Sequence, residues 1–172
     1  MAVNNVFELI KQIKNCKEKG LMYPALFMCL AIPDVCGKIS YPELNGPRQC
    51  KERYVRWFNE FVDPVWDPLK HAFPDEQMDK RFDGYACYDL RCAMLHAGET
   101  DIGEKINVDR FHIDFVPFEG GVLYNEEVDY KPKKNDDGDY EWQPEKHIQI
   151  SAAHIVSVIL EAFESFQKMP KQ

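Results

Sequence analysis

One stretch, residues 23–32, carries apolar side chains on every side and reads Tyr-Pro-Ala-Leu-Phe-Met-Cys-Leu-Ala-Ile. A helix without a polar face is stable only in the middle of a protein, so this segment predicts a central helix surrounded by at least four others. Pro24 suits a first helical position, and Pro33 interrupts the helix. We expect Asp34 to cap a short continuation that Gly37 closes.

Four other segments have apolar residues at helical spacing and would cover this central helix. Glycine or proline ends three of them, at Gly20, Pro64 and Gly98, and Ser151 precedes the fourth as an N-cap. The expected helices are 3–18, 51–62, 84–97 and 151–168.

Residues 105–150 have a different character and predict a β insert. Residues 110–117 alternate apolar and polar side chains, Gly120 and Gly121 indicate a turn, and 122–130 form a return strand. A charged loop over 131–139 and a third short strand at 147–150 follow. The predicted fold is mainly α, a bundle of about five helices with a small β-hairpin insert before the last helix. Residues 1–172 are expected to form one domain, with a helical core over 1–98 and a C-terminal helix over 151–168.

The charge of the chain is unevenly distributed. Residues 1–100 contain 13 Lys and Arg against 14 Asp and Glu, whereas residues 101–172 contain 8 against 15, within a net charge of −8. Because nucleic-acid backbones are bound by clustered Lys and Arg, this distribution argues against broad nonspecific nucleic-acid binding. A local basic patch remains in the cluster Arg48, Lys51, Arg53 and Arg56.

The six cysteines form no C-x-x-C pair, and the N-terminus has no apolar signal core. We therefore expect reduced thiols in a cytoplasmic protein. No uninterrupted apolar run reaches the roughly 18 residues that indicate a membrane span, so no membrane partner is expected.

Arg91 and His96 place charged chemistry inside the apolar pattern of residues 84–97. A guanidinium fits phosphate, and an imidazole exchanges protons near neutral pH. RNA carries its own nucleophile, the 2′-hydroxyl, so an acid, a base and a phosphate-binding cation could cleave it without a metal or other cofactor. Five helical residues turn through about 500°, which leaves the two side chains about 140° apart. Their convergence depends on the reach of Arg91 and on the place of His96 at the helix end.

A structural role is the alternative for both residues. Arg91 would pair with a carboxylate such as Asp34 or Asp89, and His96 would complement the negative end of its helix. Asp34 with Arg53 is a second candidate pair, directed at the motif as substrate-binding residues; a helix cap and a surface charge are their alternative roles. The remaining histidines and cysteines lack zinc spacing, so no metal site is predicted.

An Arg followed by His with four residues between them, near the end of a late helix in a small bundle, resembles the HEPN superfamily. The likeness covers mainly residues 1–100 and the last helix, and leaves out the β insert. Within it, segments 25–37, 52–54 and 90–98 resemble a divergent bacterial and phage group of uncharacterised proteins with a HEPN-like core.

This resemblance implies a homodimer, frequently a metal-independent ribonuclease of a toxin–antitoxin or phage-defence system, with an antitoxin or regulatory protein as partner. It also implies that Arg91 and His96 of two subunits meet across the dimer to form one catalytic site. The residue after the Arg is usually polar in active members and is Cys92 here. Cys92 and the acidic C-terminal part favour the alternative, a non-catalytic member of the same fold that binds a partner or regulates it.

Overall fold

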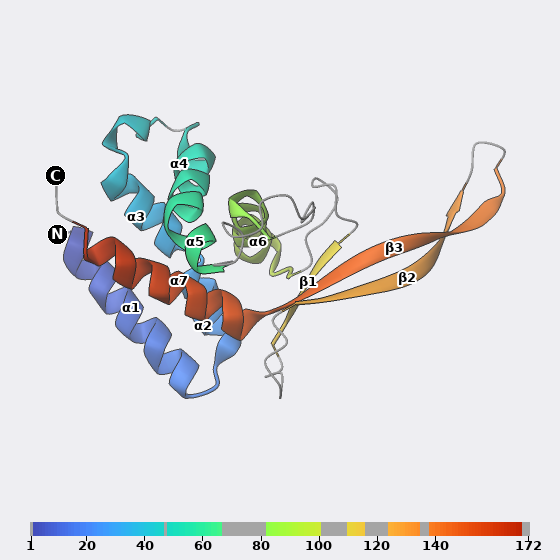
Figure 1. Ribbon diagram of the computed structural model, residues 1–172, viewed down its shortest axis with the longest axis horizontal. Helices are drawn as coiled ribbons and strands as arrows, with labels where there is room; N and C mark the ends of the chain where they lie inside the picture. The colour runs from blue at the N-terminus through green and yellow to red at the C-terminus, as the bar shows by residue number, and fades with distance from the viewer. Residues whose placement is uncertain are drawn as a thin grey trace.

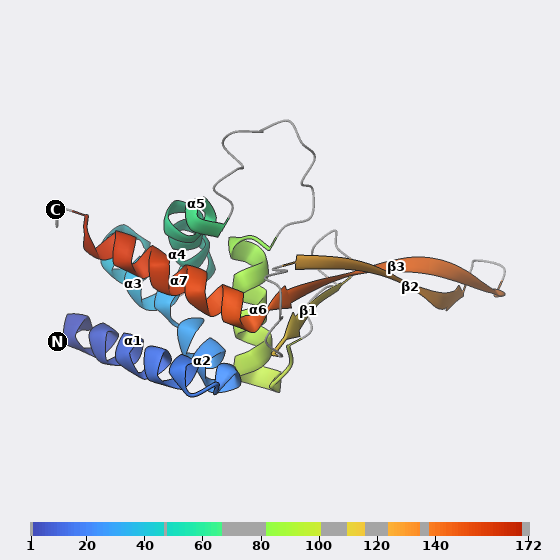
Figure 2. The same ribbon diagram turned by 60° about the horizontal axis from the view of Figure 1, so that its bottom comes forward.

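Helices dominate the computed structural model, which describes residues 2–46, 48–66, 82–100, 110–115, 124–134 and 138–169. The helices form a bundle, and a narrow sheet extends from one end of it (Figures 1 and 2). The helices are α1 (Ala2–Glu18), α2 (Met22–Cys29), α3 (Ile32–Ser40), α4 (Cys50–Trp57), α5 (Asp63–Trp66), α6 (Gly84–Ala97) and α7 (Ala152–Gln167), with a 3-10 turn at Pro42–Leu44 and a π-helix at Phe58–Val62. The strands are β1 (Arg110–Asp114), β2 (Tyr124–Lys134) and β3 (Tyr140–Ser151). The predicted mainly α bundle is confirmed.

The apolar helix α2 is central on one side only. Leu26 and Cys29 are fully buried, and Leu30 just after the helix is 2% exposed, because α1, α6 and α7 contact this side. Tyr23 and Phe27 are 44% and 39% exposed. The prediction that the whole segment is buried is therefore wrong for these two aromatic residues, which lie one helical turn apart on a side that no other described helix covers.

The predicted break near Pro33 exists but falls earlier, at residues 30–31, so that Pro33 lies in the first turn of α3. Asp34 does not cap α3. The N-cap residue is Ala31, and no side chain bonds the free N–H groups there. Gly37 does not end the helix either, since α3 continues to Ser40. A Cβ at Gly37 would lie 2.9 Å from both Cγ and the carbonyl oxygen of Arg53. Glycine is needed at this position so that α3 and α4 can approach closely.

Residues 22–40 pass the length and hydropathy test for a membrane span within the described part of the chain, with a mean hydropathy of 1.3. The prediction that no segment could span a membrane rested only on the length of uninterrupted apolar runs, so it did not identify this stretch. This apolar stretch is 44% buried inside the protein, and Ala25, Ile32 and Cys36 within it are fully buried in the bundle. A core helix has this composition too, so the stretch is weak support for a membrane span.

Pro64 does not end the third predicted helix. The helix widens into the π-helix, where the N–H of Asp63 donates to the carbonyl of Phe58, five residues back. The chain continues without a break as α5, in which Pro64 is the second residue, directly after the π-helix. The expected loop over 63–82 is thus helical at its start, and its remainder to residue 81 lies outside the described residues.

The predicted strands exist, but their pairing differs from the prediction. β1 pairs with β3 in parallel, and the hairpin joins β2 to β3, so the strand order is β1-β3-β2. The chain reverses between Lys134 and Tyr140, where Gly138 has a φ of 91°. The glycine pair 120–121, the expected turn, lies outside the described residues. Residues 131–134, expected in a loop, extend β2, and the expected short strand 147–150 is the end of β3.

The sheet is rooted in the helical core. Ile113 and Ile150 are register partners on β1 and β3, and both are almost completely buried in the same apolar cluster as the helices. Beyond this root, β2 and β3 continue as a two-stranded ribbon, the arm (residues 124–134 and 138–151), which projects away from the bundle (Figure 1).

The three remaining helices, α1, α6 and α7, agree with the prediction. The carboxylate of Asp83 accepts hydrogen bonds from the N–H groups of Tyr85 and Ala86, each at 2.9 Å, and thereby caps α6. Gly98 ends α6 with a φ of 69°. Ser151 is the N-cap residue of α7, although its hydroxyl makes no capping bond.

Candidate functional site

Arg91 is held by a carboxylate from a different helix. Its Nε donates to Oδ2 of Asp34 at 3.0 Å, and its Nη2 forms an ion pair with the same oxygen at 2.9 Å, which joins α6 to α3. The side chains of Arg91 and Asp34 are only 23% and 17% exposed. The pair is thus partly desolvated, and the structural prediction of an ion pair between Arg91 and Asp34 is confirmed. Nη1 of Arg91 contacts Sγ of Cys92 at 3.9 Å, a weak interaction.

Cys50, at the start of α4, connects Asp34 to Arg53. Its Sγ donates to Oδ1 of Asp34 at 3.2 Å and accepts from Nη2 of Arg53 at 3.8 Å. Arg53 is 9% exposed, and its Nη1 donates to the carbonyl of Leu44 at 2.7 Å. Asp34 and Arg53 therefore belong to one network but form no direct pair, and Arg53 lies beneath the site. Sequence reasoning missed Cys50, although its place three residues before Arg53 puts both on one side of a helix.

His96 is exposed on the last turn of α6. Among the described residues, neither a hydrogen bond nor an ion pair links it to Arg91 within the chain. At 100° per residue, the outward face of α6 lies between these two side chains and carries Tyr88, Cys92 and Leu95. Leu95 is 44% exposed, and Tyr85 on the preceding turns is 52% exposed. Arg91 and His96 thus border a partly apolar face, which the described residues cover only at Tyr88, where Tyr54 and Lys51 contact its ring.

Burial and charge shift the pKa values of this network. Burial and the hydrogen bond to Asp34 raise the pKa of the Cys50 thiol, which keeps it protonated as the donor to Asp34. Burial, with Cys92 and Cys50 nearby, raises the pKa of Tyr88 to about 12. Burial, the largest single influence, lowers the pKa of Arg91, but the Asp34 carboxylate together with Cys92 and Tyr88 raises it above its usual value. The site therefore holds one fixed guanidinium, one carboxylate and two neutral groups at physiological pH.

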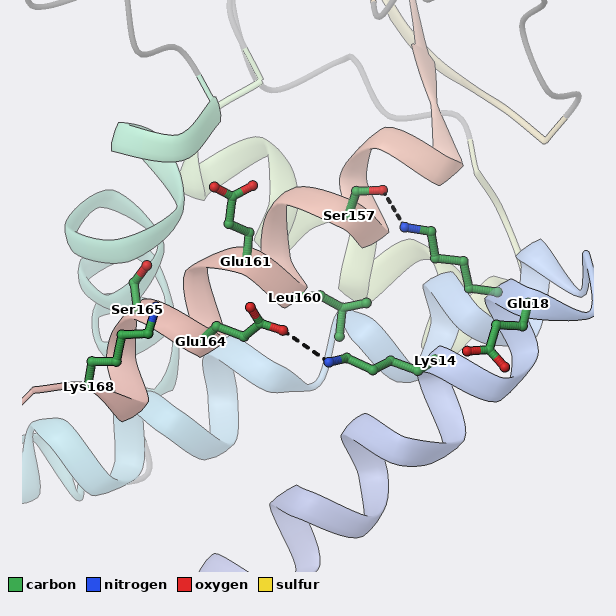
Figure 3. Close-up of a pocket in the computed structure, with 9 residues that line it drawn as sticks. Lys14, Glu18, Ser157, Leu160, Glu161, Glu164, Ser165 and Lys168 are labelled. Carbon is green, nitrogen blue, oxygen red and sulfur yellow. Dashed lines mark hydrogen bonds and ion pairs between the residues drawn. The ribbon is translucent and has the colours of Figure 1, made fainter.

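A groove of about 750 Å³ lies elsewhere, between α1 and α7 (Figure 3). In it, Lys14 pairs with Glu164 at 3.0 Å, and Nζ of Lys17 donates to Ser157 at 2.9 Å. No residue of α6 lines the groove, so it is separate from Arg91 and His96. Three lysines and three glutamates line the groove, and Lys14 and Lys17 already have partners, which gives it no net preference for a phosphate or a cation. Over the described residues, no group of three or more His, Cys, Asp or Glu could hold a metal ion.

Comparison with known proteins adds no relative: no family model, curated protein or solved structure matches this chain.

Proposed function

We propose that this protein is a HEPN-like, metal-independent ribonuclease whose catalytic site is completed by a second copy of the chain. The supporting observation is the open face of α6, where Arg91 and His96 border the apolar residues Tyr88, Cys92 and Leu95. A two-fold partner packing on this face would cover the apolar residues. The same packing would carry Arg91 of one copy toward His96 of the other, which removes the angular separation that one helix imposes.

Each residue has a defined role in this proposal. His96 of one copy accepts the proton of the RNA 2′-hydroxyl as its oxygen attacks phosphorus, and His96 of the second copy protonates the leaving 5′-oxygen. The new bond joins phosphorus to the 2′-oxygen, the bond to the 5′-oxygen breaks, and the product ends in a 2′,3′-cyclic phosphate. Arg91 stabilises the charge that develops on the phosphate. Asp34 acts through Arg91 as a positioning residue, because it engages Nε and Nη2 and leaves Nη1 with only the weak Cys92 contact.

Cleavage of mixed RNA by the purified protein tests the proposal. We expect activity in the presence of EDTA and cyclic-phosphate ends in mass spectra of the products. His96→Ala should reduce the rate by a factor on the order of 10²–10⁴, the usual effect of removing a positioned proton-transfer group. Arg91→Lys should also be severely impaired, since an ammonium does not reproduce the guanidinium fork. Glu99→Gln, an exposed change three residues beyond His96, is the matched control and should cleave at the wild-type rate.

Equal cleavage by the wild type and His96→Ala would end the catalytic hypothesis. A specific observation favours a second candidate function, a non-catalytic HEPN-like module that binds or regulates a partner. Asp34 already neutralises Arg91 inside the chain, as expected of a structural ion pair. Under this alternative no variant cleaves RNA, and His96→Ala changes only the melting temperature. A toxin–antitoxin or phage-defence role and a cytoplasmic location belong to the proposal in either form.

A further inference from the structure

The arm concentrates exposed aromatic side chains on one of its two faces. Side chains two residues apart along a strand share a face, and so do register partners across an antiparallel pair. Tyr130 and Pro132 of β2 therefore share a face with Trp142 and Tyr140 of β3, since Pro132 pairs with Trp142 and Lys134 with Tyr140. Tyr130 is 63% exposed, and Tyr140 and Trp142 are each 70% exposed. This aromatic face has no cover among the described residues.

A proline interrupts each edge of the arm, which disfavours the addition of a further strand there. Tyr130 pairs with Pro144, and Pro132 pairs with Trp142 two register positions away. In an antiparallel ladder, pairs two positions apart have the same hydrogen-bonding pattern. Proline has no N–H, so both prolines fit only where the backbone nitrogen points away from the partner strand. One proline thus removes an outward donor from the β2 edge and the other removes one from the β3 edge.

The charge of the arm limits what its aromatic face can bind. Residues 124–151 contain eight Asp and Glu against four Lys and Arg. Aromatic side chains on a basic surface would suit single-stranded nucleic acid, but an acidic surface repels phosphate backbones and anionic membranes. Two arms would also repel each other. The occupant is therefore a protein surface that is apolar and locally basic.

The bundle of a second copy offers such a surface at the start of α2. Leu21, Tyr23 and Phe27 are 51%, 44% and 39% exposed, Tyr23 packs on Phe115 of its own chain, and the exposed Lys19 precedes them. The aromatic part of the arm begins at Tyr130, six residues beyond Tyr124, and thus about 20 Å along the ribbon at 3.4 Å per residue. At that distance the arm projects away from its own bundle (Figures 1 and 2). The surface that it reaches belongs to another molecule.

The area available is sufficient for a stable dimer. An aromatic side chain buries about 150–250 Å², so the exposed parts of Tyr130, Tyr140 and Trp142 supply about 400 Å² per arm. Two reciprocal arms and the surfaces that they cover would bury about 1,600 Å², the size of a standard protein–protein interface. We propose that two copies of this chain exchange arms, with the aromatic face of each arm packed on Leu21, Tyr23 and Phe27 of the other copy.

Photo-crosslinking from the arm tests this proposal without requiring any activity, so its outcome is independent of the ribonuclease hypothesis. Benzoylphenylalanine replaces Trp142, and equimolar isotopically heavy and unlabelled proteins are mixed and irradiated. We expect crosslinks that join a heavy and an unlabelled chain, from position 142 to the tryptic peptide 20–38. The matched control places the same group at Glu141, the exposed neighbour on the opposite face of the ribbon, and should not yield this crosslink.

A second variant pair tests the receiving surface. Phe27→Ser should lower the yield of the crosslink about tenfold, the effect of removing one central aromatic contact. Phe7→Ser, at an aromatic residue of α1 that is 49% exposed, should leave the yield unchanged. Three results would overturn the proposal: crosslinks confined to one isotopic form, crosslinks to a different part of the chain, or binding of a labelled single-stranded RNA that depends on Trp142.

Discussion

The Asp34–Arg91 pair allows a quantitative test of how α3 and α6 are held together. Asp34→Asn keeps the shape of the side chain and an oxygen that can accept from Arg91, but it removes the charge. The guanidinium would then remain at 23% exposure without a counter-ion. Breaking a fully buried pair costs about 3–5 kcal/mol, and an exposed pair contributes about 0.2–1 kcal/mol. With both side chains mostly but not fully buried, we expect a loss of about 2 kcal/mol in the free energy of unfolding. For a chain of this length, that corresponds to a melting temperature lower by about 4–8 °C.

A double-mutant cycle separates the pair energy from other effects of the substitution. Denaturant unfolding of Asp34→Asn, Arg91→Gln and the double variant should give a coupling energy of about 1–2 kcal/mol. The matched control is the cycle on Lys51 and Asp89, which join α4 to the same helix at 3.2 Å with side chains 43% and 26% exposed. This control should give about 0.5 kcal/mol or less. A coupling energy for Asp34 and Arg91 no larger than that of the control would refute the argument from burial.

Three further predictions concern separate parts of the molecule. Gly37→Ala should lower the free energy of unfolding by at least about 2 kcal/mol, because the added Cβ meets the backbone of Arg53. Gly98→Ala has open space around it but a φ of 69°, so it should cost about 1 kcal/mol. Thermal melts compare the two variants. Burial of His154 lowers its pKa below the usual 6.5. As the pH falls, the unfolded chain therefore takes up a proton on this histidine at a higher pH than the folded chain does. The contribution of His154 to the free energy of unfolding should therefore be constant well above pH 6.5 and fall as the pH drops through 6.5 toward the folded pKa. Urea titrations of His154→Gln beside the wild type should show that the substitution removes this contribution. Leu95→Glu should weaken pairing through the open face of α6, which sedimentation equilibrium would detect as a larger dissociation constant, and an unchanged constant would contradict that interface.

Local signals in the sequence were sufficient for much of the helical framework. The capping carboxylate of Asp83 was not anticipated, but the apolar spacing of residues 84–97 and the glycine after them predicted α6 with the bounds that it has. A break near Pro33 was expected, because a missing N–H and a fixed φ act on the residues next to it, and the chain breaks just before it, at residues 30–31. Such features depend on the few residues along the chain that surround them, so they can be read without knowing what packs on them.

Tertiary contacts decided the rest. Asp34 stands in the first turn of α3, where a capping role is the local expectation, but Arg91, distant in sequence, binds it instead. Gly37 and Pro64 resemble helix stops, yet close packing against Arg53 and a π-helix before Pro64 let both helices continue. The hairpin formed between β2 and β3 because strand partners are chosen by pairing across the whole sheet, and alternation along one strand does not specify its neighbour. The amino-acid sequence by itself thus determined the helical bundle and the place of Arg91 and His96 on one helix. Only the tertiary structure decided that Asp34 holds Arg91, and that the arm leaves its aromatic face uncovered, because both depend on residues far apart in the chain.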